Sequence, residues 1–286
     1  MQVRFWGTRG SIAAPGPATM RYGGNTSCVE VRLADGTLII FDAGTGIRAL
    51  GQALLAQGGP VRAYLFLSHA HWDHIQGIPF FSPAYVAGTK LTILGPEHGR
   101  LTLEKIVTGQ MRSPYFPIPM HAMSAKIEFV QLGEGSVVDL PNGATVEAAV
   151  VNHPGCTLGY RLTANGTVLA YTTDNEPFGA VAASRHLVKP AHHVQLVRDA
   201  ELLIQDAQYT PEEYDPHRVG WGHSTYLDAL QIAQQAHVKR LVLFHHDPSH
   251  SDAKVDAIVV QCQAEIAQRG LAIECVGAAE GAVLAL

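Results

Sequence analysis

Three histidines and an aspartate stand within six residues, in the segment His69-Ala70-His71-Trp72-Asp73-His74. The apolar run before it, residues 63–67, is typical of a buried strand, so the segment opens the loop at that strand's end. Alternate side chains of an extended chain share a face, which pairs His69 with His71, and the next two ligands follow where the chain turns toward a helix. A solvated, histidine-rich loop is the alternative, but this density predicts two adjacent metal sites.

Further ligands of the same kind come later in the chain. His153, Asp174 and His245 each follow within three residues of the end of a hydrophobic run. Each of them alone is typical of a turn at a strand end. As a set with the first segment, they indicate that four strands bring ligands to one edge of a sheet. His246 lies farther from its strand, so we expect it to support a ligand rather than to bind metal. Nitrogen and carboxylate ligands suit zinc, and also manganese or iron.

This pattern resembles the metallo-β-lactamase-fold hydrolases, whose signature the segment 69–74 carries. Asp42, in Phe41-Asp42-Ala43-Gly44, matches the family's upstream Asp-x-Gly and would orient a ligand. The resemblance covers nearly the whole chain and implies an α/β fold, a four-layer αβ/βα sandwich, as a single domain over residues 1–286. It also implies two divalent metal ions, zinc before manganese or iron. One ion would be held by His69, His71 and His153, the other by Asp73, His74 and His245, with Asp174 bridging.

One branch of that family is more similar than the rest. The segment Gly222-His223-Ser224-Thr225 is similar to one in the RNase Z and phosphodiesterase branch, where its histidine assists phosphodiester cleavage. The loops at 7–11 and 23–27 resemble that branch as well. Bacterial RNase Z carries a long basic arm between the ligands that match His153 and Asp174, whereas only residues 155–173 lie there in this chain. This departure argues against tRNA 3′ processing.

The chemistry expected of the site follows from two metal ions and one further histidine. A hydroxide held between the ions would attack the phosphorus, and His223 would assist the leaving group. Asp206 follows the apolar run at 202–204 and would orient His223, although a helix or turn cap is the alternative. We count Asp73 among the catalytic residues as well as among the metal ligands. A lactone, ester or thioester hydrolase on the same metal site is the second function class.

Composition favours a small substrate over a nucleic acid. The net charge is −5 and the 20 Lys and Arg residues are scattered, whereas a nucleic-acid binder usually shows a basic stripe. We therefore expect a small, cyclic or linear phosphodiester such as a cyclic nucleotide. No apolar run is long enough to cross a bilayer, a strand starts at the first residues, and the four cysteines form no Cys-x-x-Cys pair. These features predict a cytoplasmic protein without a membrane partner.

Several local structures are predicted around this framework. A helix should begin after Gly46 with Thr45 as its cap, and further helices are expected at 100–108, 225–236 and 255–269. The loop at 110–120 is rich in proline, aromatic residues and methionine, so it should flank the cleft or cover a partner subunit, which predicts a homodimer. A loop packed on its own domain is the alternative. In the insert at 178–199, surface or cleft-wall positions are expected for His186, His192 and His193.

Overall fold

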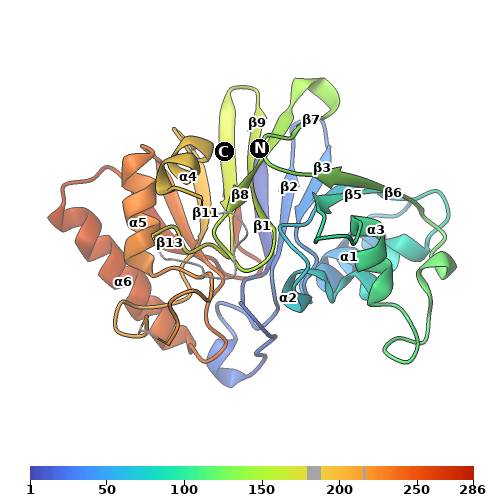
Figure 1. Ribbon diagram of the computed structural model, residues 1–286, viewed down its shortest axis with the longest axis horizontal. Coiled ribbons are helices and arrows are strands. Elements are labelled where there is room, and N and C mark those ends of the chain that lie inside the picture. Colours follow the sequence, from blue (N-terminus) through green and yellow to red (C-terminus); the bar gives the residue numbers. More distant parts are fainter. Residues whose placement is uncertain (179–187, 215–216) are drawn as a thin grey trace.

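Two β-sheets lie face to face, and helices cover the outer face of each (Figure 1). The computed structural model describes residues 1–178, 188–214 and 217–286, and the following concerns those residues. Helices α1 and α3 lie against one sheet, and α4, α5 and α6 lie against the other. This is the four-layer α/β sandwich expected from the sequence. The helices are α1 (Ile47–Ala56), α2 (Trp72–Ile75), α3 (Leu103–Gly109), α4 (Pro190–Leu196), α5 (Tyr226–Gln235) and α6 (Asp252–Gln268).

The first sheet has the strand order β14-β1-β2-β3-β4-β5-β6. Its first four strands pair antiparallel, whereas β3, β4, β5 and β6 are parallel neighbours. Parallel strands end at the same edge, so the segments after β3 and β4 lie side by side there. The strands are β1 (Gln2–Gly7), β2 (Cys28–Arg32), β3 (Leu38–Phe41), β4 (Arg62–Phe66), β5 (Lys90–Pro96), β6 (Lys126–Leu132) and β14 (Val283–Ala285).

The second sheet repeats this plan, with the order β13-β12-β11-β10-β9-β8-β7. Strands β7 to β10 pair antiparallel, and β10 to β13 are parallel. The chain between His153 and Asp174 is one hairpin, β9 and β10, which turns at Asn165 and Gly166, both at positive φ. No room for an arm remains there. The strands are β7 (Val137–Asp139), β8 (Thr145–Val151), β9 (Thr157–Ala164), β10 (Thr167–Thr172), β11 (Leu202–Asp206), β12 (Arg240–Phe244) and β13 (Glu274–Gly277).

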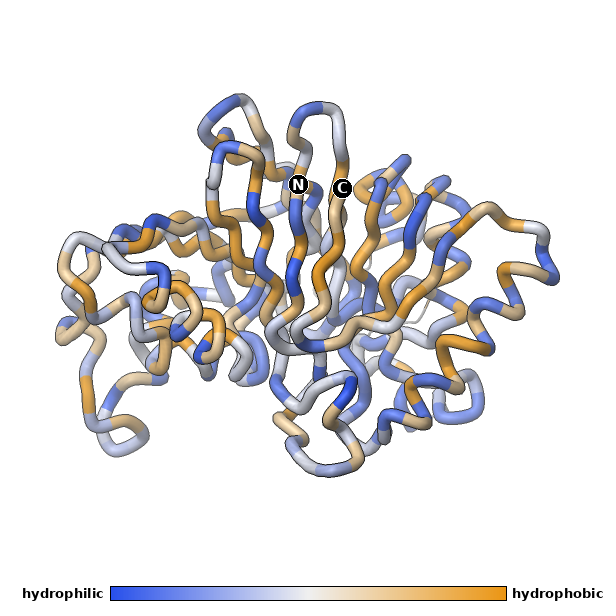
Figure 2. Tube along the Cα trace, turned by 180° about the vertical axis from the view of Figure 1, so that it is seen from behind, coloured by the Kyte–Doolittle hydropathy of each residue, from blue (hydrophilic) through white to orange (hydrophobic). Residues whose placement is uncertain are grey.

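The mainly aliphatic core between the sheets contains a group of packed aromatic rings. Phe41 of β3 stacks on Tyr171 of β10, with ring centroids 5.1 Å apart, and Phe66 meets Tyr160 edge to face at 5.3 Å. These rings are fully buried, and each contributes roughly 1.5–3 kcal/mol through removal from water. Figure 2 shows the hydrophobic residues running along the central strands. These rings thus join the two sheets close to the ends of β3 and β10, which are followed by Asp42 and by the predicted ligand Asp174.

Some local predictions differ from the structure. Thr45 does not cap α1, because its hydroxyl accepts from the backbone N–H of Thr26 at 2.9 Å, and the helix begins after Gly46. α6 begins at Asp252, three residues before the predicted start, because the Ser251 side chain caps it. The predicted cap of α5 is present, since Thr225 and Asp228 form a capping box.

The loop at 110–120 packs mainly on its own sheet and helices. Met111 is fully buried in the cluster beneath α1 and α3, and Phe116 and Met120 pack against the same cluster. Tyr115 remains exposed. Self-packing therefore accounts for much of the apolar character that suggested a partner subunit. Among the described residues, no helix has the length and apolar character needed to span a membrane.

Candidate metal centre and active site

The seven predicted ligands come together at the edge where β3, β4, β8, β10 and β12 end. They form two groups that share Asp174, and the ligand atoms within each group lie within 4.8 Å of one another. Six of the seven side chains are buried, whereas His71 is exposed and marks the open side of the site. The first group is His69, His71, His153 and Asp174, and the second is Asp73, His74, His245 and Asp174.

Asp174 lies between the two groups with one carboxylate oxygen facing each. Its Oδ1 is 3.2 Å from His74 Nε2 and 3.1 Å from His245 Nε2. Its Oδ2 is 3.6 Å from His69 Nε2 and 3.7 Å from His153 Nε2. Atoms bound 2.0–2.1 Å from one tetrahedral ion lie roughly 3.3–3.4 Å apart, so these separations suit ligands around two centres.

The outer nitrogens of the histidines are held by partners, which turns the inner nitrogens toward the shared carboxylate. His74 Nδ1 lies 2.8 Å from Asp42 Oδ2, and His245 Nδ1 lies 3.1 Å from Gln208 Oε1. Such partners fix the tautomer and orientation of metal-binding imidazoles. The inner Nε2 atoms of His69 and His74 are buried and make no hydrogen bond. Buried, unpaired nitrogens that face carboxylates fit bound divalent cations.

The charges in the site are also consistent with the binding of divalent cations. Burial lowers the pKa of His153 to about 4, so its imidazole is neutral and able to bind metal. Burial raises the pKa of Asp174, but His245 and His74 outweigh it and hold that pKa well below the usual range. For His74, burial lowers the pKa, yet the carboxylates of Asp174 and Asp73 raise it well above its usual value. The carboxylates therefore concentrate positive charge at this edge.

Backbone strain also gathers at the site. Asp42, Asp174 and His245 all have positive φ, at 59°, 47° and 61°. Left-handed backbone at non-glycine residues costs on the order of 1 kcal/mol and persists where the surroundings enforce it. Gly10 is one such constraint, because a Cβ there would lie 2.5 Å from the His245 ring. The next residue, Ser11, donates its backbone N–H to Asp73 Oδ2 at 2.8 Å.

His223 stands beside the metal groups, paired with a carboxylate. Its Nδ1 lies 2.8 Å from Asp206 Oδ2, and its ring stacks on that of His245 with centroids 5.1 Å apart. Burial lowers the pKa of His223, but the charge and hydrogen bond of Asp206 raise it to about 9. Asp206 also accepts from the backbone N–H of Ser224 at 2.9 Å, so it orients both the imidazole and the turn into α5.

Two histidine predictions were wrong. His246 does not support a ligand: its Nε2 lies 2.9 Å from the Ala278 carbonyl oxygen, away from the metal groups. His193 is neither a surface nor a cleft-wall residue, because it lies on the buried face of α4, with its Nδ1 2.8 Å from Asn175 Nδ2. His192 on the same helix is exposed, as expected, and His186 lies outside the described residues.

Several supporting residues were missed in the sequence. Ser68 lies 3.0 Å from His69 Nδ1 through its Oγ, and it also donates to Asp42. Its place directly before the ligand segment was a usable signal. Gln208 follows Asp206 by two residues and was readable in the same way. Tyr171, which donates its hydroxyl to Asp42 Oδ2 at 2.7 Å from the opposite sheet, had no local signal.

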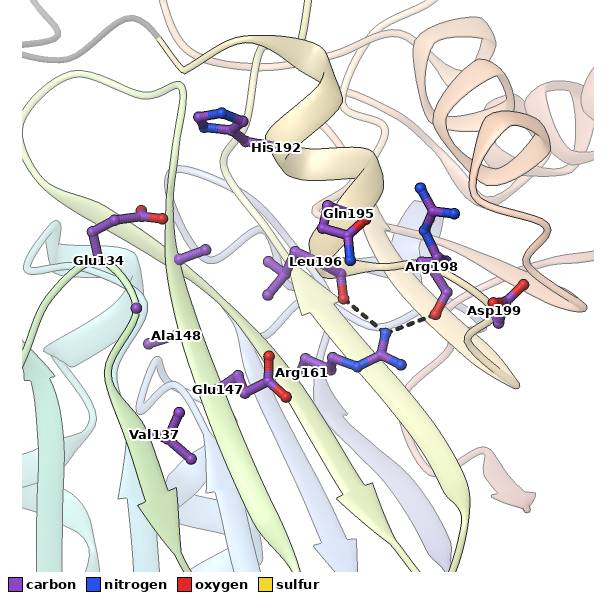
Figure 3. Close-up of a pocket in the computed structure, with 12 residues that line it drawn as sticks. Glu134, Val137, Glu147, Ala148, Arg161, His192, Gln195, Leu196, Arg198 and Asp199 are labelled. Atoms are coloured by element: carbon purple, nitrogen blue, oxygen red, sulfur yellow. Dashed lines mark hydrogen bonds between the residues drawn. The ribbon is translucent and has the colours of Figure 1, made fainter.

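Two cavities differ in their relation to this centre. One, of about 300 Å³, is walled by His69 and His71 and continues past Glu97, Ile106 and Cys156. A second, of about 480 Å³, lies by α4 on the outer face of the second sheet (Figure 3). There Arg161 of β9 donates to the carbonyl oxygens of Leu196 and Arg198, at 2.9 and 2.7 Å. These hydrogen bonds hold the C-terminal end of α4 against the sheet. Of these two cavities, the smaller one is lined by candidate metal ligands, His69 and His71.

Comparisons with known proteins agree with this geometry. Residues 37–246 match the family described as Beta-lactamase superfamily domain. Ribonuclease Z of Methanosarcina mazei is 28% identical over 88% of this chain and 89% of its own length. Ribonuclease Z of Lactobacillus gasseri is 26% identical over 86% of this chain and 87% of its own length.

Solved structures share the fold. YhfI from Bacillus subtilis, a metallo-β-lactamase fold protein, has a TM-score of 0.68 and 18% identity, with 99% of this chain and 98% of that chain covered. A diphosphatase from the PhnP family has a TM-score of 0.66 and 19% identity, with 100% and 97% covered. The match over 37–246, together with the ligand groups at the sheet edge, shows that the chain belongs to the beta-lactamase superfamily domain family and has the metallo-β-lactamase fold.

Proposed function

We propose that this protein is a metal-dependent phosphodiesterase that cleaves small, cyclic or linear phosphodiesters such as cyclic nucleotides. The observation that carries the proposal is the pairing of His223 with Asp206 beside the two ligand groups. Two divalent ions, zinc before manganese or iron, would activate water and neutralise phosphate oxygens when bound at these groups. His69, His71 and His153 would hold one ion. Asp73, His74 and His245 would hold the other, with Asp174 between them.

The part proposed for His223 is proton donation to the leaving oxygen. Asp206 holds Nδ1 at 2.8 Å, which leaves Nε2 as the nitrogen that can meet the substrate. With its pKa raised to about 9, the imidazole carries a proton at neutral pH. An alkoxide leaves phosphorus readily only when it is protonated, so a donor at this position serves phosphodiester cleavage. A lactone or ester, whose carbonyl carbon is attacked, has less need of it.

The cavity beside His69 and His71 supports a small substrate. Its volume of about 300 Å³ lies at the lower end of the range for small-molecule sites. Among the described side chains that line it, Glu97 is the charged carboxylate and none is Lys or Arg. An RNA strand would need cations there to neutralise its phosphates, whereas a neutral substituent of a small phosphodiester would not.

The curated relatives named Ribonuclease Z make tRNA 3′ processing the second candidate. The hairpin of β9 and β10 argues against it, because it leaves no arm between His153 and Asp174. The overall charge of −5 argues in the same direction.

A substrate panel tests the proposal. Zinc- or manganese-loaded protein is assayed with bis(p-nitrophenyl) phosphate, 2′,3′- and 3′,5′-cyclic nucleotides, a precursor tRNA and a lactone. Asp174→Ala serves as the inactive control, because Asp174 faces both ligand groups. We expect turnover of at least one small phosphodiester and little trimming of the tRNA at physiological salt. Efficient tRNA trimming would favour the second candidate, and a lactone turned over far faster than every phosphodiester would refute the proposal.

A further inference from the structure

Glu176 is a buried carboxylate that the proposed chemistry does not use. It lies two residues after Asp174 and only 2% of it is exposed. Its Oε1 and Oε2 accept from the backbone N–H of Gly220, at 2.9 and 3.0 Å, and Oε2 accepts from that of Gly222 at 2.8 Å. The hydroxyl of Tyr214 donates to Oε1 as well. All three donors belong to the segment that leads into His223.

The backbone of Gly222 connects this carboxylate with the predicted metal ligand His153. Its N–H points at Glu176, and its carbonyl oxygen lies 2.9 Å from His153 Nδ1. A carbonyl oxygen can only accept, so His153 carries its proton on Nδ1 and offers Nε2 to the metal group. Gly222 has φ +86°, and a Cβ there would lie 2.2 Å from His153 Nδ1. The peptide therefore fits directly against the imidazole.

The same segment also fixes the backbone that leads into His223. Glu176 holds the backbone immediately before this residue, and Asp206 holds its ring from the other side. The backbone N–H groups of Gly220 and Gly222, both at positive φ, converge on one point, as backbone N–H groups do where they bind an anion. In this protein the anion is the chain's own carboxylate.

We infer that Glu176 is a positioning residue that acts through Gly222 on two groups at once, the metal ligand His153 and the proposed proton donor His223. A glutamate suits this position because both of its oxygens face the backbone N–H of Gly220, and a carboxylate oxygen can only accept. A glutamine of equal size would place its NH2 group against that N–H in either orientation, which weakens the arrangement without emptying the space.

The test compares Glu176→Gln with Glu134→Gln in zinc-loaded protein. Glu134 is the control, because its carboxylate also accepts a backbone N–H, that of Val150 at 2.6 Å, but it is exposed and lies outside the metal groups. The first measurement is zinc retention against a competing chelator. Loss of an outer partner of a metal-binding histidine typically costs 10–100-fold in metal affinity, so we expect roughly a tenfold loss for Glu176→Gln and none for the control.

Two further measurements separate positioning from general stability. The His153 Nδ1–H resonance, identified by its loss in His153→Gln, should be protected from solvent exchange in the parent protein and in Glu134→Gln but not in Glu176→Gln. The rate ratio between alkyl and p-nitrophenyl phosphodiesters should fall in Glu176→Gln, as it should when His223 itself is removed. If Glu176→Gln does not fold, Glu176→Asp, which keeps the charge but shortens its reach, is measured by the same criteria.

Only the rate ratio rests on the proposed phosphodiesterase function. If no phosphodiester is hydrolysed, the proposed function fails, while zinc retention and the imidazole resonance still test Glu176. A Glu176→Gln protein that melts at lower temperature but keeps its zinc affinity, its protected His153 resonance and its rate ratio would overturn the inference. Glu176 would then serve stability alone.

Discussion

Removal of the His223 imidazole should slow the reaction to an extent that depends on the leaving group. The structure gives His223 one orienting carboxylate, 2.8 Å away at Asp206, and leaves it 8% exposed. A held and desolvated proton donor should provide the full effect of general acid catalysis, roughly a hundredfold to ten-thousandfold. At about 1.4 kcal/mol per tenfold, this corresponds to about 3–6 kcal/mol of transition-state stabilisation.

The assay measures kcat for two phosphodiesters with zinc-loaded parent, His223→Ala and a control. For a ribose or other alkoxide leaving group, we expect the full loss. For p-nitrophenolate, which departs without a proton, we expect a loss of about tenfold or less. His192→Ala is the control, because His192 is an exposed histidine on α4 outside the ligand groups, and it should leave both rates unchanged. Metal content is determined in parallel.

Other outcomes would refute the reasoning in distinct ways. Equal large losses on both substrates, with metal retained, would indicate charge stabilisation rather than proton donation. Unchanged rates would reduce His223 to a residue that shapes the start of α5. Loss of metal would make it a ligand, a geometry that its proximity to Asp206 and His245 allows.

Four further predictions concern the metal centre and its surroundings. Protein purified without chelator should hold close to two metal ions per chain by elemental analysis, and Asp174→Ala should reduce both, whereas one ion or none after reconstitution would contradict two sites. Gly10→Ala should lower zinc affinity and activity by about tenfold, because its Cβ would meet His245 at 2.5 Å and such overpacking costs roughly 1–3 kcal/mol; an unchanged enzyme would show that the loop yields freely. Ile106→Trp, which narrows the 300 Å³ cavity, should raise KM for a cyclic nucleotide more than for dimethyl phosphate, and equal effects would exclude this cavity from binding. Light scattering at micromolar protein should give a dimer mass that Tyr115→Glu reduces to that of a monomer, whereas a monomeric parent would end the dimer proposal.

Much of the candidate metal centre could be predicted from local sequence patterns. The strand ends picked out the candidate ligands, whereas the resemblance to the metallo-β-lactamase-fold hydrolases implied which of them share an ion. Parallel neighbours then bring such ends to one edge, which is why Asp174 and His245, 71 residues apart, meet with atoms 3.1 Å apart. The absence of an arm between His153 and Asp174 could be predicted as well, because the few residues between them suffice only for a hairpin.

Side-chain direction, in contrast, was decided by tertiary packing. His245 and His246 are adjacent in the chain, but a left-handed backbone at His245 sends one ring to the metal groups and the other to Ala278. His193 is buried because α4 packs on the second sheet, which no pattern in its own segment revealed.

The long-range contacts that orient the ligands follow the same rule. Tyr171 reaches Asp42 across the two sheets, and Glu176 reaches His153 only through the carbonyl of Gly222. A pattern of residue types specifies which strands are buried and where they end. Which nitrogen of an imidazole faces inward depends on partners brought close by the packing of both sheets, and that information is not local to any segment.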